Sequence, residues 1–279
     1  MMWSFRAELL KLRKRPAVWV LGLLALALVL LFGYVITYLN YLSTKSGRIG
    51  FGVDPQQLLL GRLPNEMVRQ VMEWVPSECG AVALILGALT GGSEYGWGTL
   101  KTMLTRRPPR LAVYGGKVLA LGVVLAVIVL AMYAVAAGAS LTIARIEGVA
   151  VRWPPAWQVA EGIGAAWLIL SMWASFGLLL ATLTRGTALS IGLGLLWMLL
   201  VEGLIGESVA RLVGVVTAIA RVLPGANAAS LVDSFGAIVG GTPTTAGEVS
   251  GGQAVWTLAM YIVAFLALAM LLFRTRDVT

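Results

Sequence analysis

Residues 91–110, GGSEYGWGTLKTMLTRRPPR, form a polar and basic insert between two long apolar runs. The rest of the chain is strongly apolar, with 59% hydrophobic residues and a mean hydropathy of +0.88. Almost all of it is therefore expected to lie in a bilayer. A structured polar insert in such a chain predicts a cytoplasmic loop that binds a soluble partner.

Composition restricts the chemistry open to this chain. Only 12% of its 279 residues are charged, and apolar runs of about 20 residues recur, each long enough to cross the hydrocarbon core. There is no histidine and one cysteine, Cys79, which excludes imidazole-based dyads, His/Cys metal clusters and internal disulfides. The pI near 10.0 is typical of basic loops facing anionic lipid, so we expect no nucleic acid partner, and no metal or cofactor on this chain.

The apolar runs predict an all-α, polytopic membrane protein that forms a single domain over residues 1–279. We expect six transmembrane helices, an even number that places both termini on the same side. Their expected bounds are Ala17–Leu39, Val71–Leu89, Lys117–Ile143, Trp157–Leu180, Ala188–Ile205 and Gln253–Phe273.

Basic residues are unevenly divided between the two sides of this layout. If the N-terminus is cytoplasmic, the cytoplasmic segments contain 13 of the 21 basic residues and only three of the 13 acidic ones. The 13 basic residues are Arg6, Lys11, Arg13, Lys14, Arg15, Lys101, Arg106, Arg107, Arg110, Lys117, Arg185, Arg274 and Arg276. The positive-inside rule therefore predicts that both termini are cytoplasmic.

Residues 1–16, ahead of the first apolar run, predict an interfacial helix. Trp3 and Leu10 fall on one helical face, and Glu8 and Lys11 fall on the opposite face. A helix of this kind is expected to lie in the inner membrane interface. The alternative is a simple positively charged anchor before the first span.

Residues 202–252 are too polar for a further span and too apolar for a solvated loop. The apolar runs 212–220 and 231–239 are each too short to cross a membrane. They predict re-entrant or interfacial helices in the outer leaflet, with Pro224-Gly225 as the turn between them.

The insert itself predicts a short helix over residues 94–105. Gly91 and Gly92 are expected to break the preceding span, and Ser93 is expected to cap the new helix. The two prolines at 108–109 end the helix because they cannot continue its hydrogen-bond ladder. The result would be a short rod parallel to the membrane, held at both ends by spans.

In this insert, Glu94 is followed by GTLK at 98–101, LTR at 104–106, Arg110, and Gly-Lys at 116–117. The pattern resembles the signature of ATP-binding cassette (ABC) transporter permeases of the exporter class, with the ABCG-like or type V six-helix fold. The resemblance covers the whole layout of the chain and implies that the helix in loop 91–110 is a coupling helix, seated in a cleft of an ATPase subunit. The implied coupling residues are Glu94, Tyr95, Thr99, Leu100, Lys101, Met103, Leu104 and Arg106. The alternative is an ordinary basic loop.

The resemblance also implies partners. The only Gly-Lys pair, Gly116-Lys117, is followed by Val118 and lacks the other P-loop residues, so ATP and Mg²⁺ are expected on a separate ATPase chain. We therefore expect this chain not to be an enzyme. Permeases of the family work in pairs, which implies a homodimer or a related second permease.

Glutamates occur toward the outer ends of two predicted spans. Ionisable groups at membrane depth are costly, and they usually face protein, a partner charge or water. We expect these carboxylates to attract a cationic substrate or to pair with outer arginines such as Arg69, beside a hydrophobic path. The predicted pathway and outer-gate residues are Glu78, Glu202, Glu73 and Trp197. The alternative is that the glutamates are simply solvated at the interface.

The combined expectation is the permease subunit of an exporter in a prokaryotic plasma membrane. Short loops favour a substrate taken from the cytoplasm or inner leaflet, such as an amphipathic or antimicrobial peptide or a hydrophobic drug. The alternatives are a carrier driven by an ion gradient, a sodium-extruding permease, a membrane enzyme relying on its glutamates, and a factor that binds a peptide without moving it.

Overall fold

The computed structural model describes residues 2–47, 54–96, 110–202, 222–236 and 250–275. Within these ranges all regular structure is helical, which confirms the predicted all-α class. Five helices are long and apolar enough to cross a membrane, so the chain is a multi-pass membrane protein. They are Pro16–Lys45, Pro64–Ser93, Leu111–Ile146, Ala156–Thr184 and Gly251–Arg274.

The first two of these spans are each assembled from consecutive helical pieces. The first joins α2 (Pro16–Leu30), the π-helical turn η1 (Leu31–Val35) and α3 (Ile36–Lys45). The second joins η2 (Pro64–Glu66), α5 (Met67–Trp74), the π-helical turn η3 (Val75–Cys79) and α6 (Gly80–Gly96). Pro76 lies in η3, and its missing N–H explains why the α-helical hydrogen bonding is interrupted there.

The other spans are uninterrupted helices: α8 (Arg110–Ile146), α9 (Ala156–Thr184) and α13 (Gly251–Thr275). The shorter helices are α1 (Met2–Lys14), α4 (Pro55–Leu60), α10 (Thr187–Leu196) and α12 (Pro224–Asp233). With its 37 residues, α8 is about 55 Å long, whereas the hydrocarbon core is about 30 Å thick. The bundle is therefore longer than the membrane is thick, and part of it projects into water.

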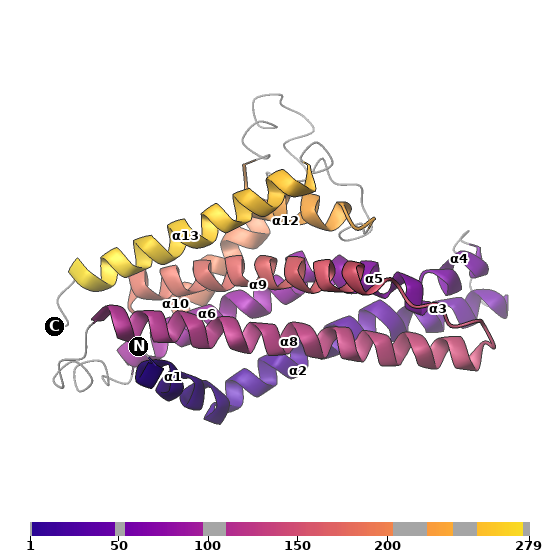
Figure 1. Ribbon diagram of the computed structural model, residues 1–279, viewed down its shortest axis with the longest axis horizontal. Coiled ribbons are helices and arrows are strands. Elements are labelled where there is room, and N and C mark those ends of the chain that lie inside the picture. Colours follow the sequence, from indigo (N-terminus) through magenta and orange to yellow (C-terminus); the bar gives the residue numbers. More distant parts are fainter. Residues whose placement is uncertain (1, 48–53, 97–109, 203–221, 237–249, 276–279) are drawn as a thin grey trace.

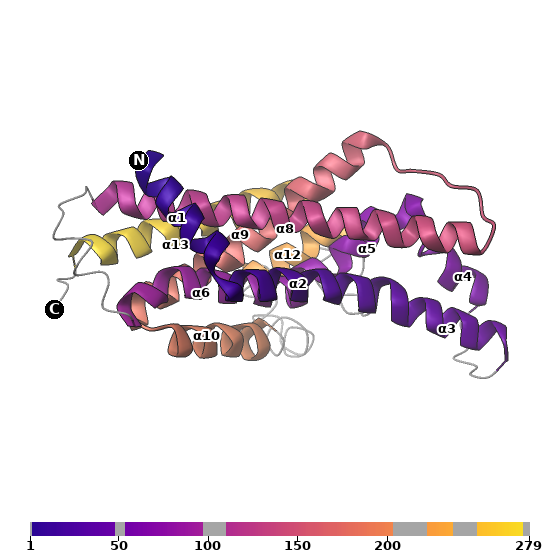
Figure 2. The same cartoon turned by 90° about the horizontal axis from the view of Figure 1, so that it is seen from below.

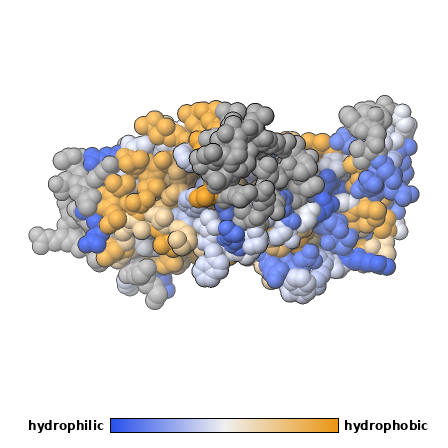
Figure 3. Space-filling view, turned by 90° about the horizontal axis from the view of Figure 1, so that it is seen from above, coloured by the Kyte–Doolittle hydropathy of each residue, from blue (hydrophilic) through white to orange (hydrophobic). Residues whose placement is uncertain are grey.

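The long helices run along one axis of the molecule (Figures 1 and 2). The Thr275 end of α13 and helix α1 lie at one end, whereas α3 and α4 lie at the other. On the face seen in Figure 3, hydrophobic residues gather over the part nearer α1, and hydrophilic residues gather toward the α3–α4 end. The α3–α4 end is therefore the more polar end of the bundle, and we infer that the polar part beyond the spans projects into water there.

The fifth predicted crossing, Ala188–Ile205, is described only as far as Glu202. The segment Thr187–Glu202 is an apolar helix about 24 Å long at about 1.5 Å per residue, which is shorter than the hydrocarbon core. Its continuation lies outside the described residues. This fifth predicted crossing therefore stays a prediction, while the other five are supported.

Helices α6 and α9 pack backbone to backbone through glycines. A Cβ atom added at Gly87 would lie 2.7 Å from the carbonyl carbon of Ala174, and one added at Gly177 would lie 2.9 Å from that of Leu84. Only glycine allows such an approach, which is the usual reason for small residues between membrane helices. This contact forms the centre of the bundle, with Trp173 buried beside it.

The prediction that Gly91 and Gly92 break the second span is wrong. Helix α6 continues through both residues to Gly96, so Ser93 lies inside it and does not cap a new helix. A Cβ at Gly91 would lie 2.8 Å from Leu178 Cδ1, and one at Gly92 would lie 3.0 Å from the backbone of Gly186. These glycines serve close packing on α9 and on the turn before α10, and that packing outweighs their low helix propensity.

The prediction of a turn at Pro224-Gly225 is also wrong. These two residues begin α12, where proline is favoured because its missing N–H would have no helical partner in any case. The helix ends at Asp233, so the predicted second run 231–239 starts inside it. Helix α12 is largely buried and about 15 Å long, too short to cross the bilayer.

Candidate functional site

Charged residues of α1 and α8 meet a backbone carbonyl of α6 at the α1 end of the bundle. Lys117 Nζ on α8 lies 3.6 Å from Glu8 Oε2 on α1 and donates a 3.0 Å hydrogen bond to the Thr90 carbonyl on α6. Lys11 Nζ lies 2.6 Å from Glu8 Oε1. Glu8 and Lys117 are only 4% and 5% exposed. We call Glu8, Lys11, Thr90 and Lys117 the Glu8–Lys117 cluster.

The local sequence explains why this cluster forms. A Cβ at Gly116 would lie 2.8 Å from Phe5 N, so the glycine beside Lys117 lets α1 rest directly on α8. A helix, α1, is present at the predicted N-terminal position, with Trp3 and Leu10 exposed and Glu8 turned into the bundle, and its interfacial location stays a prediction. The face that packs on the bundle contains Glu8 together with the apolar Phe5, Leu9 and Leu12, whereas Lys11 is exposed, so α1 does not pack by the polar face that its sequence predicts.

The cluster connects the helices that border residues 97–109. Thr90 lies near the Gly96 end of α6, and Lys117 lies two turns after the start of α8. Arg15 adds a third connection, because its Nη1 donates a 3.1 Å hydrogen bond to the Leu89 carbonyl. A displacement of either bordering helix would therefore act on α1 through buried charges.

The predicted coupling residues are only partly described. Glu94 and Tyr95 lie in the last turn of α6, whose continuation replaces the start of the predicted loop helix. Their side chains, and all of Thr99, Leu100, Lys101, Met103, Leu104 and Arg106, lie outside the described residues.

Two of the predicted gate residues are brought together at the other end of α10. Trp197 Nε1 donates a 3.4 Å hydrogen bond to Glu202 Oε1, and the Gly225 amide donates a 3.0 Å hydrogen bond to Glu202 Oε2. The carboxylate thus lies at the N-terminus of α12, where backbone amides and the helix dipole favour a negative charge. A side chain at position 225 would collide with it.

An aromatic pocket of about 360 Å³ lies next to this carboxylate. The Phe176 ring centroid is 5.1 Å from that of Phe265 and 5.9 Å from that of Trp197. Tyr261 closes one side, where its hydroxyl donates a 2.8 Å hydrogen bond to the Val222 carbonyl. Rings beside a carboxylate suit an apolar or cationic group.

The other two predicted gate residues lie elsewhere, on the second span. Glu78 is in η3 and accepts a hydrogen bond from the Ser77 hydroxyl. Glu73 is in α5 and interacts electrostatically with Arg62 and Arg69. Arg69 makes a 2.9 Å ion pair with Glu66. Neither Glu73 nor Glu78 lines the aromatic pocket, so the four residues do not form one site.

A cluster at the projecting end was not predicted from the sequence. Glu147, just after α8, accepts 2.8 Å hydrogen bonds from the hydroxyls of Tyr38 and Tyr41, and Lys45 Nζ lies 3.0 Å from its Oε2. The Tyr41 and Lys45 hydrogen bonds, followed by that of Tyr38, lower the pKa of Glu147. The signal in the sequence was the spacing of Tyr38, Tyr41 and Lys45, which places them along one face of a helix.

We expect Glu147→Gln to lower the thermal unfolding midpoint at pH 7 by a few degrees. Because the folded-state pKa is depressed, the ionised carboxylate stabilises the fold above its unfolded pKa of about 4.3, and this stabilisation is lost as the pH falls through the lower folded-state pKa. The difference between wild type and variant should therefore vanish in acid. Midpoints measured from pH 7 to pH 3 test this, with the exposed Glu161→Gln as the control. An unchanged difference at pH 3 would contradict the assignment.

The Glu8–Lys117 cluster was also not predicted. The sequence did contain a signal for it: Lys117 stands alone at the start of an apolar run, and Glu8 is the one acidic residue of a basic segment. Each of these charges needs a partner when it is buried. Within the described ranges, no group of three Cys, Asp or Glu side chains is placed to hold a metal ion.

The comparisons with known proteins give one family. A family model described as a protein of unknown function (DUF2705) matches residues 67–279. The match takes in α5 through α13 and leaves out α1 and the first span. No curated protein matches the chain.

Proposed function

Because the chain belongs to DUF2705, a family of proteins of unknown function, we propose its role from its own residues: it is the permease subunit of an ABC-type exporter. In this proposal a separate ATPase chain binds residues 94–110, the part of the predicted loop beyond the buried residues 91–93 of α6, from the cytoplasm and hydrolyses ATP with Mg²⁺. The chain itself carries out no chemistry, and it moves its substrate across a prokaryotic plasma membrane as part of a dimer.

The observation that carries the proposal is the Glu8–Lys117 cluster. A coupling loop can drive a permease only if its movement reaches the spans, and this cluster joins α1, α6 and α8 immediately beside the loop. Buried charges resist separation, because breaking one pair leaves the other charge without compensation. A pull on the loop would then move three helices together.

The direction of the chain supports six crossings with both termini on one side. The Phe273 ring of α13 lies 6.0 Å from that of Tyr114 on α8, the helix on which α1 packs, so both ends of the described chain lie at the same end of the bundle (Figure 1). The segment Thr187–Glu202 starts beside Gly92 at this end, and Glu202 reaches Gly225 of α12. The chain between α9 and α13 therefore runs back toward the other end, as a fifth crossing would.

The substrate proposal rests on the aromatic pocket and Glu202. An amphipathic peptide offers both apolar and cationic groups, and a hydrophobic drug offers rings, each of which suits this lining. A second permease copy would cover α13, since only 11% of its most apolar window is buried within the chain. Glu78 and Glu73 would serve the outer gate from the second span.

An ion-gradient-driven carrier, including a sodium-extruding one, is the second candidate. The observation that favours it is Glu202, a partly buried carboxylate at the end of an apolar helix, held by Trp197 and an amide. Such carboxylates mark ion paths in many carriers. This mechanism needs no ATPase, and that separates it from the first proposal.

Co-purification with the ABC-type ATPases of its own genome tests the exporter proposal. The chain should retain one of them in detergent and stimulate its ATP hydrolysis. Leu100→Asp should weaken the complex about tenfold or more, because truncating or charging a central interface side chain has effects of this size. Glu94→Ala should reduce the stimulation of hydrolysis.

The matched control is Leu60→Asp, on an exposed leucine of α4 at the opposite end of the bundle. It should leave the complex intact. If no ATPase binds, or if Leu60→Asp and Leu100→Asp act alike, the exporter proposal fails. Transport that persists without ATP and stops when the ion gradient is collapsed would then favour the carrier.

A further inference from the structure

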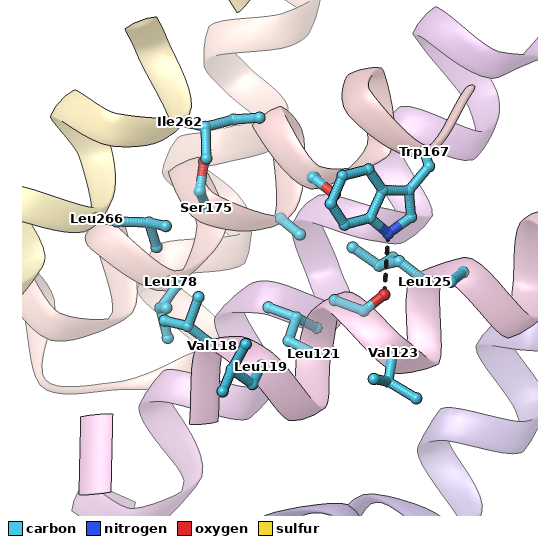
Figure 4. Close-up of a pocket in the computed structure, with 14 residues that line it drawn as sticks. Val118, Leu119, Leu121, Val123, Leu125, Trp167, Ser175, Leu178, Ile262 and Leu266 are labelled. Carbon is cyan, nitrogen blue, oxygen red and sulfur yellow. Dashed lines mark hydrogen bonds between the residues drawn. The ribbon is translucent and has the colours of Figure 1, made fainter. Parts of the chain in front are cut away.

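A second cavity, of about 440 Å³, lies between α8, α9 and α13 (Figure 4). Its walls are almost entirely apolar, with Leu121 and Leu125 from α8, Leu178 from α9, and Ile262 and Leu266 from α13. Its volume is within the range of about 300–1,000 Å³ that small-molecule sites have. It shares no residue with the aromatic pocket beside Glu202.

The cavity opens toward the lipid. Leu119 and Val123 of α8 and Trp167 of α9 line it and are also exposed, at 49%, 41% and 40%. All its lining residues lie inside the three candidate spans. A molecule that reaches the cavity from this opening must therefore come from the hydrocarbon region of the bilayer, and must itself be largely apolar.

One polar group in the cavity wall is unpaired. Trp167 Nε1 donates a 2.9 Å hydrogen bond to the Gly122 carbonyl, and the Ser175 hydroxyl donates a 2.8 Å hydrogen bond to the Met172 carbonyl. Ser171 Oγ is buried and has no hydrogen-bond partner within the described part of the chain. A buried hydroxyl without a partner is costly, so a ligand that completes its hydrogen bonding would gain binding free energy.

The depth of Ser171 restricts the ligand further. It lies near the middle of α9, a helix of 29 residues, and so near the middle of the bilayer. Phospholipid ester groups remain near the interface and would not reach it. The partner of this hydroxyl must be a polar atom carried deep into the membrane by an otherwise apolar molecule.

We propose that the cavity between α8, α9 and α13 binds a small apolar molecule from the bilayer, one that has aromatic or aliphatic rings and a single hydrogen-bond acceptor for Ser171. The apolar walls hold the rings, and the hydroxyl selects for the acceptor. Binding needs only this chain and a membrane, so the proposal stands apart from the exporter proposal and from any ATPase.

Benzophenone is a suitable probe, because it has two rings, one carbonyl acceptor, and reacts with nearby C–H bonds under light. The wild-type chain in nanodiscs should show saturable labelling within residues 118–126 and 171–178, mapped by mass spectrometry. Ser171→Ala should weaken the saturable labelling about threefold to tenfold, the effect of one neutral hydrogen bond. Diphenylmethane has a methylene group in place of the carbonyl and cannot accept a hydrogen bond from Ser171. It should therefore bind equally well to the cavity of the wild-type and Ser171→Ala proteins when it competes with benzophenone.

Filling the cavity supplies the second arm of the test. A Cβ at Gly122 would lie 3.7 Å from Trp167, an ordinary van der Waals distance. The Gly122→Leu protein should therefore fold, with the new leucine side chain inside the cavity. Labelling should fall about tenfold or more, since even two excluded methylene groups are worth that much. Gly138→Leu adds the same side chain to α8 where no atom lies within 4 Å, and it should label normally.

Equal labelling of the Gly122→Leu and Gly138→Leu proteins would overturn the proposal, as would labelling spread evenly over the lipid-facing residues of α2 and α13. If Gly122→Leu fails to fold, Leu266→Phe fills the same cavity from α13 and should give the same loss. Unchanged labelling of the Ser171→Ala protein would show that Ser171 does not bind the ligand, and it would contradict the proposed selection for a hydrogen-bond acceptor.

Discussion

Lys117→Met is expected to lower the free energy of unfolding by about 3–5 kcal/mol, the cost of breaking a buried ion pair from one side. Among the described residues Glu8 would keep Lys11 as its one ion-pair partner, and the Thr90 carbonyl would lose its side-chain donor. Unfolding of the purified chain by SDS in mixed micelles would measure the change. In the complex with an ATPase, the same variant should reduce stimulation of hydrolysis more than it reduces binding.

A double-mutant cycle and a surface control make this prediction specific. Glu8→Gln combined with Lys117→Met should recover part of the lost stability, because the double variant no longer buries the Glu8 carboxylate without its Lys117 partner. Lys14→Met removes a positive charge from the exposed face of α1 and should change stability by no more than about 0.5 kcal/mol. If Lys14→Met and Lys117→Met cost the same, the cluster does not stabilise the bundle.

Gly177→Ala is expected to cost about 3 kcal/mol or more, at the upper end of overpacking effects. The new methyl group would lie 2.9 Å from the Leu84 carbonyl carbon and 3.0 Å from Ala88 N, both backbone atoms that cannot rotate away. Helices α6 and α9 would have to separate along their whole contact. Folded yield and the thermal unfolding midpoint in detergent should both fall, and Gly87→Ala should behave in the same way.

Gly164→Ala is the matched control, since it makes the same change on the same helix where no atom lies within 4 Å. It should be neutral, or should stabilise the chain by up to about 1 kcal/mol through the better helix propensity of alanine. The two substitutions are therefore expected to have opposite signs. A similar loss from both would mean that helix propensity or insertion, and not the α6–α9 contact, limits stability.

The sequence predicted all five spans found in the described residues, because the signal for a span is local. An apolar run of sufficient length must be helical to satisfy its backbone in lipid, wherever the rest of the chain lies. The structure lengthens these spans, most of all the second, which was expected over Val71–Leu89 and runs from Pro64 to Ser93. The presence of helix α1 was likewise readable, but the face by which it packs was not, because Glu8 is buried with Leu12 while Lys11 stays exposed.

The same local reasoning failed at Gly91, Gly92 and Pro224. Glycine pairs and Pro-Gly pairs usually mark breaks and turns. Here the glycines are held in α6 by close packing on neighbouring helices. The proline starts α12, and the Gly225 amide in the first turn of that helix donates a hydrogen bond to the Glu202 carboxylate. The contacts that decide these cases come from residues tens of positions away, so no local pattern could reveal them.

The candidate site was predicted in part for similar reasons. Trp197 and Glu202 were both predicted as gate residues and do lie together, but they are only five positions apart on one segment. Glu73 and Glu78 were grouped with them by depth in the membrane alone, and the structure gives them different neighbours. Depth follows from position within a span, whereas the partner of a charge follows from how the spans are arranged.

The sequence by itself determined that this chain is helical, crosses a membrane several times and carries a basic segment between two spans, because hydropathy and charge act residue by residue. Only the tertiary structure decided that Glu8, Thr90 and Lys117 meet, that α6 and α9 touch through glycines, and that a cavity opens to the lipid between α8, α9 and α13. These features depend on which helix faces lie against one another. That choice is made by close packing and buried charge across the whole bundle, and it leaves no mark in any single stretch of sequence.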